Sequence, residues 1–224
     1  REAQARGVAI ELVRNGSRGL YWLEPMVEVE AAEGRIAYGP VSLSDVPSLF
    51  DAGFIRGGAH ALRIGRPEDH PYLKKQQRLA FARVGVVDPR SLDDYLATGG
   101  YRGLKAALGM TGEAVVEAVT RSGLRGRGGA AFPTGIKWRT VLAQSAKQKY
   151  IACNADEGDS GTFADRMLME GDPFTLIEGM AIAGVAVGAS KGYIYIRSEY
   201  PAAIATMRKA VQTARNAGAA VRRS

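Results

Sequence analysis

Alternating apolar and polar positions run through the first part of the chain and predict a small group of strands. Residues 8–13 are rich in β-forming side chains and are followed by turn residues. Residues 26–30 alternate strictly, and a second run at 35–38 follows directly after Glu33-Gly34. Two such runs around a short turn predict a β-hairpin.

A short helix is predicted at 44–50, where Ser or Asp supplies the N-cap. A hairpin followed by a helix is typical of the closing half of a thioredoxin-like layer, so residues 1–58 are interpreted as a thioredoxin-like N-terminal piece. From 59 to 110 the pattern becomes irregular and basic, with helices predicted at 74–84 and 91–97. We interpret this stretch as a connecting arm.

Beyond position 110, helical and strand-like runs alternate with short connections, and this order is typical of an α/β domain with a partly parallel sheet. Capping residues, prolines and glycines mark the helix ends. The predicted helices are 111–121, 137–142, 172–187 and 201–217, and the predicted strands are 150–153 and 193–197. Residues 111–224 thus form the third predicted unit.

Composition narrows the class of protein. The most apolar run, 180–189, falls short of the ~20 residues that a membrane helix needs, so we expect no membrane insertion. A net charge of +7 is compatible with nucleic-acid binding, but the charges are spread along the chain. A subunit that docks on acidic neighbours or holds a phosphorylated cofactor would look the same, and we expect no nucleic-acid partner.

Cysteine and histidine are scarce. Cys153 is the single cysteine, and the two histidines are His60 and His70. One thiol forms no internal disulfide and cannot hold an iron–sulfur cluster alone, since such clusters usually take four thiolates. No zinc site of standard ligand spacing can be built either. We expect no metal site within this chain, and a reducing, cytoplasmic setting.

The run Gly126-Arg127-Gly128-Gly129 opens a glycine-rich segment that continues to Gly135. Dense glycines let backbone N–H groups converge on an anion, an arginine adds a charge-assisted fork, and a following helix start with Lys137 faces the same point. The spacing also fits a dinucleotide fingerprint, which requires a strand rather than a helix before it. An RGG box is disfavoured because the run occurs once, between capped helices. Two interpretations stay open: a loop that binds a phosphate, and a glycine loop with a purely structural role.

Two polar segments follow predicted strands. Residues 154–162 carry three carboxylates within four positions, and 195–200 carry Glu199 near a strand end. Ligands of α/β sheets lie outside the carboxyl ends of strands, where both segments would be. The alternatives are an acidic surface loop that caps the next helix and, for Glu199, a cap of the helix that begins at Pro201. Taken alone, the acidic segment favours the capping interpretation.

Together these segments resemble one family. The motifs Ser122-Gly123-Leu124-Arg125-Gly126-Arg127-Gly128-Gly129, Phe132-Pro133-Thr134-Gly135-Ile136-Lys137-Trp138 and Cys153-Asn154-Ala155-Asp156-Glu157 are similar to those of the NADH-binding flavoprotein subunit of respiratory complex I. The same module serves NAD-reducing hydrogenases and NAD-dependent formate dehydrogenases. The resemblance covers about residue 73 to the C-terminus.

The resemblance implies FMN and NAD as ligands and assigns residues to them. The residues implied for FMN are Gly126, Arg127, Gly128, Gly129, Lys137, Asn154, Asp156, Glu157, Tyr195, Ser198 and Glu199. Those implied for NAD are Phe132 near its rings, Asp159 near the nicotinamide and Glu199 on a ribose, where it would disfavour NADP. No side chain is expected to act as a catalytic acid or nucleophile, because the flavin itself exchanges the hydride.

The run 157–163, with Asp172-Pro173-Phe174, resembles most closely the formate dehydrogenase β subunit, and the segment 19–25 points the same way. That resemblance implies a hetero-oligomer with an iron–sulfur small subunit and a molybdenum-containing catalytic subunit. Ala131 and Ser198 depart from the family, which has glycine at both positions in many members. Residues 219–224 do not resemble the family's continuation, and its C-terminal [4Fe–4S] domain would lie beyond this chain. We therefore expect a fragment. The alternatives from other classes are a cofactor-free structural adaptor and a nucleic-acid-binding module.

Overall fold

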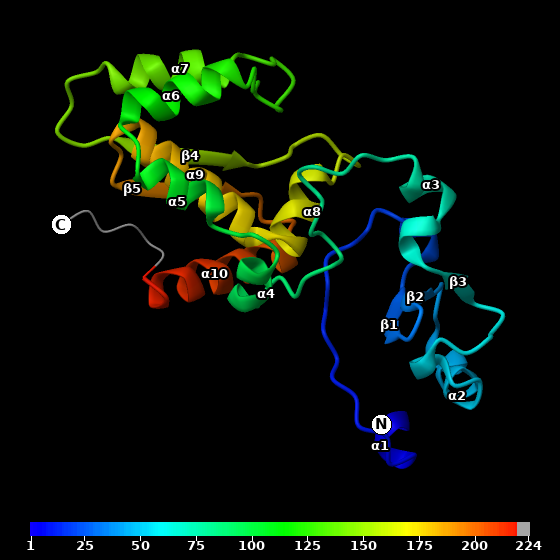
Figure 1. Cartoon of the computed structure of the whole chain (residues 1–224). Helices are drawn as coiled ribbons and strands as arrows, with labels where there is room; N and C mark the ends of the chain where they lie inside the picture. The colour runs from blue at the N-terminus through cyan, green and yellow to red at the C-terminus, as the bar shows by residue number, and fades with distance from the viewer. Residues whose placement is uncertain (219–224) are drawn as a thin grey trace.

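The computed structural model describes residues 1–218 and shows two lobes joined by extended chain (Figure 1). The smaller lobe contains an antiparallel sheet of three strands, and the larger one contains a parallel pair of strands among helices. This mixture of helices with a small parallel sheet confirms the predicted α/β class. The predicted arm, 59–110, contributes to both lobes, and the division into three units stays a prediction.

The smaller lobe is built on the predicted hairpin. Strands β1 (Val27–Ala31) and β2 (Gly34–Tyr38) pair antiparallel, and β3 (Arg63–Gly65) joins the other edge of β2. Helix α2 (Val46–Asp51) lies close to its prediction. The other short elements are α1 (Glu2–Ala5), α3 (Pro71–Lys74) and the 3₁₀ turns Tyr21–Leu23, Leu43–Asp45, Phe54–Arg56 and Pro67–Asp69. The core is formed by Ile36, Tyr38, Val41, Leu49 and Phe54. Its thioredoxin-like identity stays a prediction.

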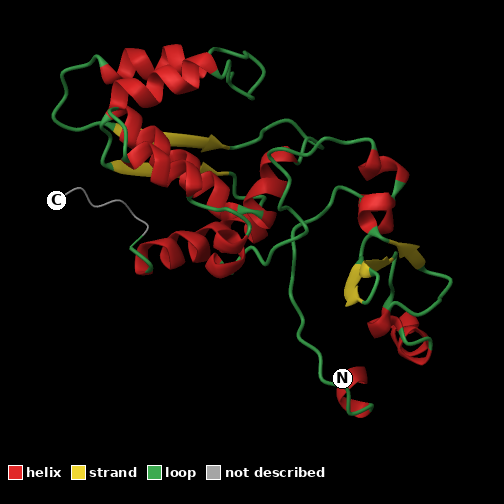
Figure 2. Cartoon of the chain, in the orientation of Figure 1, coloured by secondary structure: helices red, strands yellow, loops and turns green. Residues whose placement is uncertain are grey.

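The larger lobe surrounds one apolar helix, α9, which contacts most of the other elements in this lobe (Figure 2). Apolar residues lie on all sides of α9, and a helix of this kind is stable only when it is buried, which explains its central position. The helices are α4 (Leu92–Ala97), α5 (Arg102–Leu108), α6 (Gly112–Arg121), α7 (Thr134–Leu142), α8 (Ala164–Gly171), α9 (Pro173–Val187) and α10 (Pro201–Asn216). The strands are β4 (Tyr150–Ala155) and β5 (Lys191–Ile196).

Strands β4 and β5 run parallel, so their carboxyl ends lie side by side. Alternate residues face opposite sides of the pair. Inward-facing side chains such as Ile151 and Ile194 pack against the helical core. The other face carries Tyr150, Tyr193 and Tyr195, which are 52%, 60% and 65% exposed. The open face matters for the site, because it carries predicted residues from both strands.

Two predictions of secondary structure are wrong. Residues 8–13 are extended but unpaired, with Leu12 80% exposed, because in the described structure no neighbouring strand offers them an edge. The helix predicted at 74–84 ends at Lys74 and gives way to turns. Tertiary contacts hold this stretch instead: Arg83 pairs with Asp172 at 2.8 Å, and Val84 is fully buried.

The N-terminal segment 15–21 is packed along helix α8 of the larger lobe. Gly16 lies against Gly171 so closely that a Cβ on Gly16 would overlap the Gly171 backbone. Further along, Gly19 approaches Met167, and the rings of Tyr21 and Phe163 meet edge to face at 6.1 Å. The segment therefore runs antiparallel to α8 and connects the two lobes before β1 begins.

A buried carboxylate joins three helices of the larger lobe. Glu178 of α9 is 9% exposed and accepts hydrogen bonds from the N–H groups of Tyr101 and Leu104, at 2.7 and 2.8 Å. It also accepts one from the hydroxyl of Tyr95 on α4. The carboxylate thus caps the N-terminus of α5 from a different part of the chain, because those first N–H groups have no partner inside their own helix.

Alkaline pH is expected to weaken this core. Burial, with a smaller contribution from Glu178, raises the pKa of Tyr101 to about 12. The unfolded chain ionises its tyrosines near pH 10, so it loses protons that the folded chain keeps. The stabilisation is complete below about pH 10 and is lost as the pH rises toward about 12. Urea unfolding would measure how much the free energy of unfolding falls between about pH 9 and about pH 11. This fall should be smaller for Tyr101→Phe than for wild type, and an equal fall would show that Tyr101 is not its cause.

Candidate functional site

The glycine-rich segment forms a closed loop between α6 and α7. Its base is held by two backbone hydrogen bonds of 2.9 Å each, from the N–H of Gly126 to the oxygen of Phe132 and from the N–H of Thr134 to the oxygen of Leu124. The Arg125 guanidinium donates to the oxygen of Ala131 at 3.1 Å. A helix, α6, precedes the loop, and this order disagrees with the strand that a dinucleotide fingerprint needs.

The glycines of this region serve two different purposes. A Cβ on Gly135 would lie 2.7 Å from Thr120 Cα, so this glycine is required for the close packing of α7 on α6. By contrast, a Cβ on Gly128 or Gly129 would meet nothing within 4 Å. Packing within the chain therefore does not explain why position 128 is a glycine. Gly129 has a φ of +98°, which favours glycine on conformational grounds.

Two hollows lie beside the loop, with volumes of about 470 and 400 Å³. The first is lined by residues of the loop itself, including Arg127, and the second adds Phe132, Lys137 and Trp138 from the loop and α7. No side chain caps the first amides of α7, so its positive end is available to an anion. Ala131, a departure from the family pattern, adopts φ +50°, a left-handed conformation that glycine would take without strain.

The acidic segment after β4 is only partly free for a ligand. Both oxygens of Glu157 accept backbone hydrogen bonds at the start of α8, from Asp165 at 2.8 Å and Arg166 at 3.1 Å. This is the capping role that the sequence analysis kept as an alternative. Asn154 accepts a hydrogen bond from the N–H of Asp156 at 3.2 Å through its side-chain oxygen, while Asp159 is exposed.

The turn after β5 places three polar side chains together. Arg197 donates to the carboxylate of Glu199 at 3.0 Å, and Ser198 donates to the other oxygen of Glu199 at 3.1 Å. The hydrogen bond from Arg197 is the largest cause that lowers the pKa of Glu199 to about 2, so this carboxylate is ionised at neutral pH.

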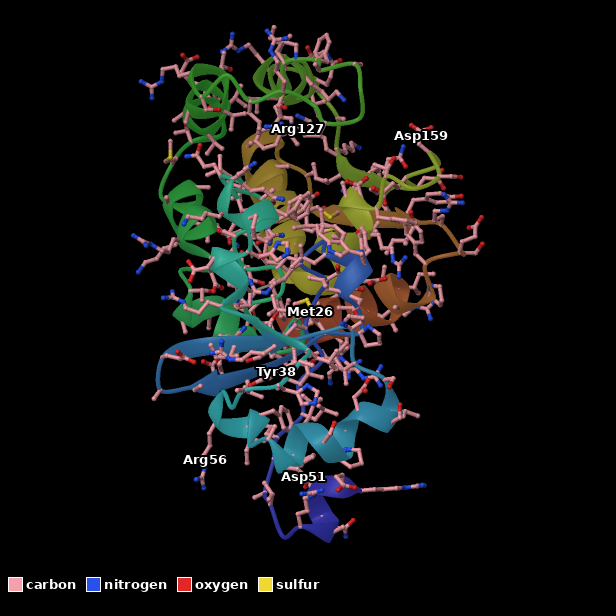
Figure 3. All side chains as sticks on the ribbon, turned by 90° about the vertical axis from the view of Figure 1, so that its right-hand side faces the viewer. Met26, Tyr38, Asp51, Arg56, Arg127 and Asp159 are labelled. Atoms are coloured by element: carbon pink, nitrogen blue, oxygen red, sulfur yellow. The ribbon has the colours of Figure 1, made fainter. Side chains whose placement is uncertain are left out.

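The structure groups the predicted residues into two sets. Asn154 and Tyr195 are register neighbours on the open face of the sheet, and Glu157 and Glu199 follow at the two strand ends. The glycine-rich loop forms the second set, and among the described residues none of 154–161 lines either hollow. Figure 3 shows Arg127 and Asp159 in the same upper part of the molecule, on separate loops.

Sequence reasoning gave no role to Arg197, although it lay within a segment that was singled out. Its Nη1 donates to the backbone oxygen of Glu157 at 2.8 Å, so it ties the acidic segment to the turn after β5. The only sequence feature that could have pointed to Arg197 was its position, as a cation at the end of a strand with alternating residues. Trp138, which lines the second hollow, was likewise quoted only as part of a motif.

The described residues lack two kinds of feature, a cluster of metal-ligating side chains and a membrane-spanning helix. Across 1–218, no group of three or more His, Cys, Asp and Glu side chains is placed to hold a metal ion. Within the same residues no helix is long and apolar enough to cross a bilayer. Burial raises the pKa of the Cys153 thiol, with a smaller contribution from Asp165.

Comparison with known proteins gives consistent matches. Residues 119–223 match the family described as the Nuo51 FMN-binding domain. The NADP-reducing hydrogenase subunit HndC of Solidesulfovibrio fructosivorans is 56% identical over 145 residues, which cover 65% of this chain and 29% of that protein. An NADH-quinone oxidoreductase subunit of Escherichia coli (strain K12) is 41% identical over 157 residues, which cover 69% of this chain and 34% of that one.

Among solved structures, a crystal structure of an NAD+-reducing [NiFe]-hydrogenase in the H2-reduced state aligns with a TM-score of 0.50 and 28% identity, and covers 83% of this chain and 30% of that one. The chain spans about a third of the length of the curated relatives it matches. These similarities confirm the family resemblance of the motifs. The family match extends into 219–224, which we expected not to resemble the family and which lie outside the described residues.

Proposed function

We propose that this chain, whose residues 119–223 match the Nuo51 FMN-binding domain family, carries part of the FMN- and NADH-binding site of a diaphorase subunit. Such a subunit exchanges hydride between NAD(H) and FMN and passes electrons to or from iron–sulfur clusters, including a [4Fe–4S] cluster in the part of the subunit beyond this chain. The observation that carries the proposal is the open glycine-rich loop, where Gly128 and Gly129 face free space beside two hollows.

The loop suits the phosphate of a mononucleotide. Backbone N–H groups without neighbouring Cβ atoms, the uncapped start of α7 and the cations Arg127 and Lys137 all favour an anion. Bound FMN would supply the hydride and single-electron chemistry, while the protein supplies binding and orientation. Phe132 is 51% exposed at the second hollow and offers a ring face to a nucleotide base or nicotinamide.

The residues at the strand ends are proposed for the rest of the cofactor and for NAD. Asn154 and Tyr195, side by side on the open face of the sheet, would face the flavin's polar edge. Glu199 would hold a ribose diol, and Asp159 would lie near the nicotinamide. Glu157 would act differently from our first expectation: its carboxylate caps α8, so it would shape the site through its backbone.

For the enzyme as a whole we propose the β subunit of an NAD-dependent formate dehydrogenase, on the resemblance of residues 157–163 and 19–25. Iron–sulfur and molybdenum-containing partner subunits in a cytoplasmic hetero-oligomer belong to that proposal. The similarity to HndC favours a second candidate, the diaphorase subunit of an NAD(P)-reducing hydrogenase. Formate-dependent and H2-dependent reduction of NAD by the purified complex would distinguish the two.

The proposal is tested on the full-length subunit by removing the two cations of the loop. Arg127→Ala and Lys137→Ala should each weaken FMN binding by about 10- to 100-fold, because a charge-assisted hydrogen bond contributes about 1.5–3 kcal/mol. Flavin absorbance and NADH–acceptor activity should fall together. The control is Arg208→Ala with Lys209→Ala, on the exposed side of α10, which should keep the flavin.

Full flavin retention by the double variant of Arg127 and Lys137 would refute the assignment of the loop. A purified wild-type subunit without flavin absorbance would favour the structural adaptor instead. Salt-dependent binding of an oligonucleotide would favour the nucleic-acid-binding module.

A further inference from the structure

Arg197 is held by two contacts besides its ion pair. Its Nη1 donates to the Glu157 oxygen at 2.8 Å, and its guanidinium lies over the ring of Tyr200 at 5.3 Å, while its Nε is buried without a hydrogen-bond partner. The side chain is 21% exposed. These contacts fix the plane of the guanidinium and leave Nη2 as the group that faces Glu199.

The partner at that edge is exposed and replaceable. Nη2 donates to Glu199 at 3.0 Å, and the Glu199 side chain is 62% exposed. Exposed ion pairs contribute little net free energy because water and salt compete with them. An anion that brings more than one oxygen to a fixed guanidinium can compete with such a carboxylate, since the planar fork matches phosphate geometry.

We infer that Arg197 is the second determinant of nucleotide preference, and that the ribose 2′-phosphate of NADPH binds the edge of Arg197 that Glu199 now occupies. The inference rests on the proposed function, because that function brings the ribose to Glu199. With Glu199 in place, its charge neutralises the guanidinium and repels a phosphate. Without it, the same turn presents an oriented cation and the Ser198 hydroxyl, which are the groups a 2′-phosphate requires.

In the alternative, Glu199 alone sets the preference for NADH over NADPH by repelling the 2′-phosphate. A double variant of Glu199 and Arg197 distinguishes this alternative from our inference. On the FMN-loaded full-length subunit, Glu199→Gln should raise kcat/KM for NADPH by about 10- to 100-fold. Adding Arg197→Gln should remove about nine-tenths of that gain, whereas Arg197→Lys, which keeps a cation, should retain part of it. Arg208→Gln, far along α10, is the matched control and should leave the gain intact.

Binding measured without turnover separates recognition from folding. Calorimetry with adenosine 2′,5′-bisphosphate should show tighter binding to Glu199→Gln than to wild type, and this difference should disappear with Arg197→Gln. AMP, which lacks the 2′-phosphate, should bind Glu199→Gln equally well with and without Arg197→Gln. Flavin absorbance identifies any variant whose site has collapsed; for Arg197→Gln the comparison then uses Arg197→Lys.

Each outcome has a distinct meaning. An equal gain for NADPH in Glu199→Gln with and without Arg197, with flavin retained, overturns the inference and leaves the proposed function intact. A wild-type subunit that binds neither FMN nor NADH overturns the proposed function, and the inference with it.

Discussion

Replacing Glu178 by alanine is expected to lower the free energy of unfolding by about 3–5 kcal/mol, the cost of leaving several buried polar groups without partners. The carboxylate accepts three hydrogen bonds, from Tyr95, Tyr101 and Leu104, in a position that is 9% exposed. Its loss would leave two backbone N–H groups at the start of α5 without acceptors. Because α4, α5 and α9 meet at this carboxylate, the helical core of the larger lobe should loosen as a unit.

Urea unfolding monitored by circular dichroism would measure this change. Glu178→Gln is the matched variant: the N–H groups of Tyr101 and Leu104 bind different carboxylate oxygens, so the single amide oxygen can accept from only one of them. The glutamine variant should therefore lose about half as much free energy of unfolding as the alanine variant. Tyr95→Phe removes only one of the three donors and leaves no N–H unpaired, and it should cost about 1 kcal/mol. A loss below about 1 kcal/mol for Glu178→Ala would show that the three hydrogen bonds contribute little to stability.

Replacing Gly135 by alanine should disturb both stability and the candidate site. The added methyl group would lie 2.7 Å from Thr120 Cα, so α7 must move away from α6. Overpacking of this kind typically costs about 1–3 kcal/mol. Since Gly135 lies in the first turn of α7, the displacement should also move Lys137 and the base of the glycine-rich loop, and FMN affinity should fall by at least about tenfold.

Gly179→Ala provides the matched control, because this glycine is also helical but a Cβ there would meet nothing within 4 Å. Alanine should stabilise α9 by up to about 1 kcal/mol, the difference in helix propensity. Parallel thermal unfolding and flavin titration of the two variants would test the comparison. Equal behaviour of the two variants would mean that helix propensity, rather than the contact with Thr120, governs both positions.

The elements that were predictable carry their signals locally. Thr111 caps α6 through a 3.2 Å hydrogen bond from the N–H of Ala114, and α9 begins at Pro173 and ends before Gly188, as the sequence indicates. The helices that were missed, α5 and α8, have no local side-chain cap. Glu178 caps α5 from more than seventy positions away, and Glu157 caps α8 from eight positions before Asp165. The cap of α5 depends on the tertiary fold, so no local pattern reveals it, whereas helix capping by the acidic segment was one of the two interpretations of the sequence.

In the candidate site, too, some features have local sequence signals and others depend on the tertiary fold. The dense glycines around Arg127 lie in one stretch of sequence and predict the loop that forms between α6 and α7. The pairing of Asn154 with Tyr195 depends on the register of two strands that are separated by two helices. Arg197 could not be assigned from the sequence either, because its acceptor at Glu157 lies forty positions away.

The path of residues 15–21 along α8 affects the order in which the chain can fold during synthesis. These residues leave the ribosome about 150 positions before Gly171, and the surface that covers them is complete only when Gly171 has been added. At the usual rate of about 5–20 residues per second, the delay is on the order of ten seconds. During that interval the side chains of Leu20 and Tyr21 are available to chaperones, and pulse labelling of ribosome-bound chains should find residues 15–21 protected only after α8 has emerged.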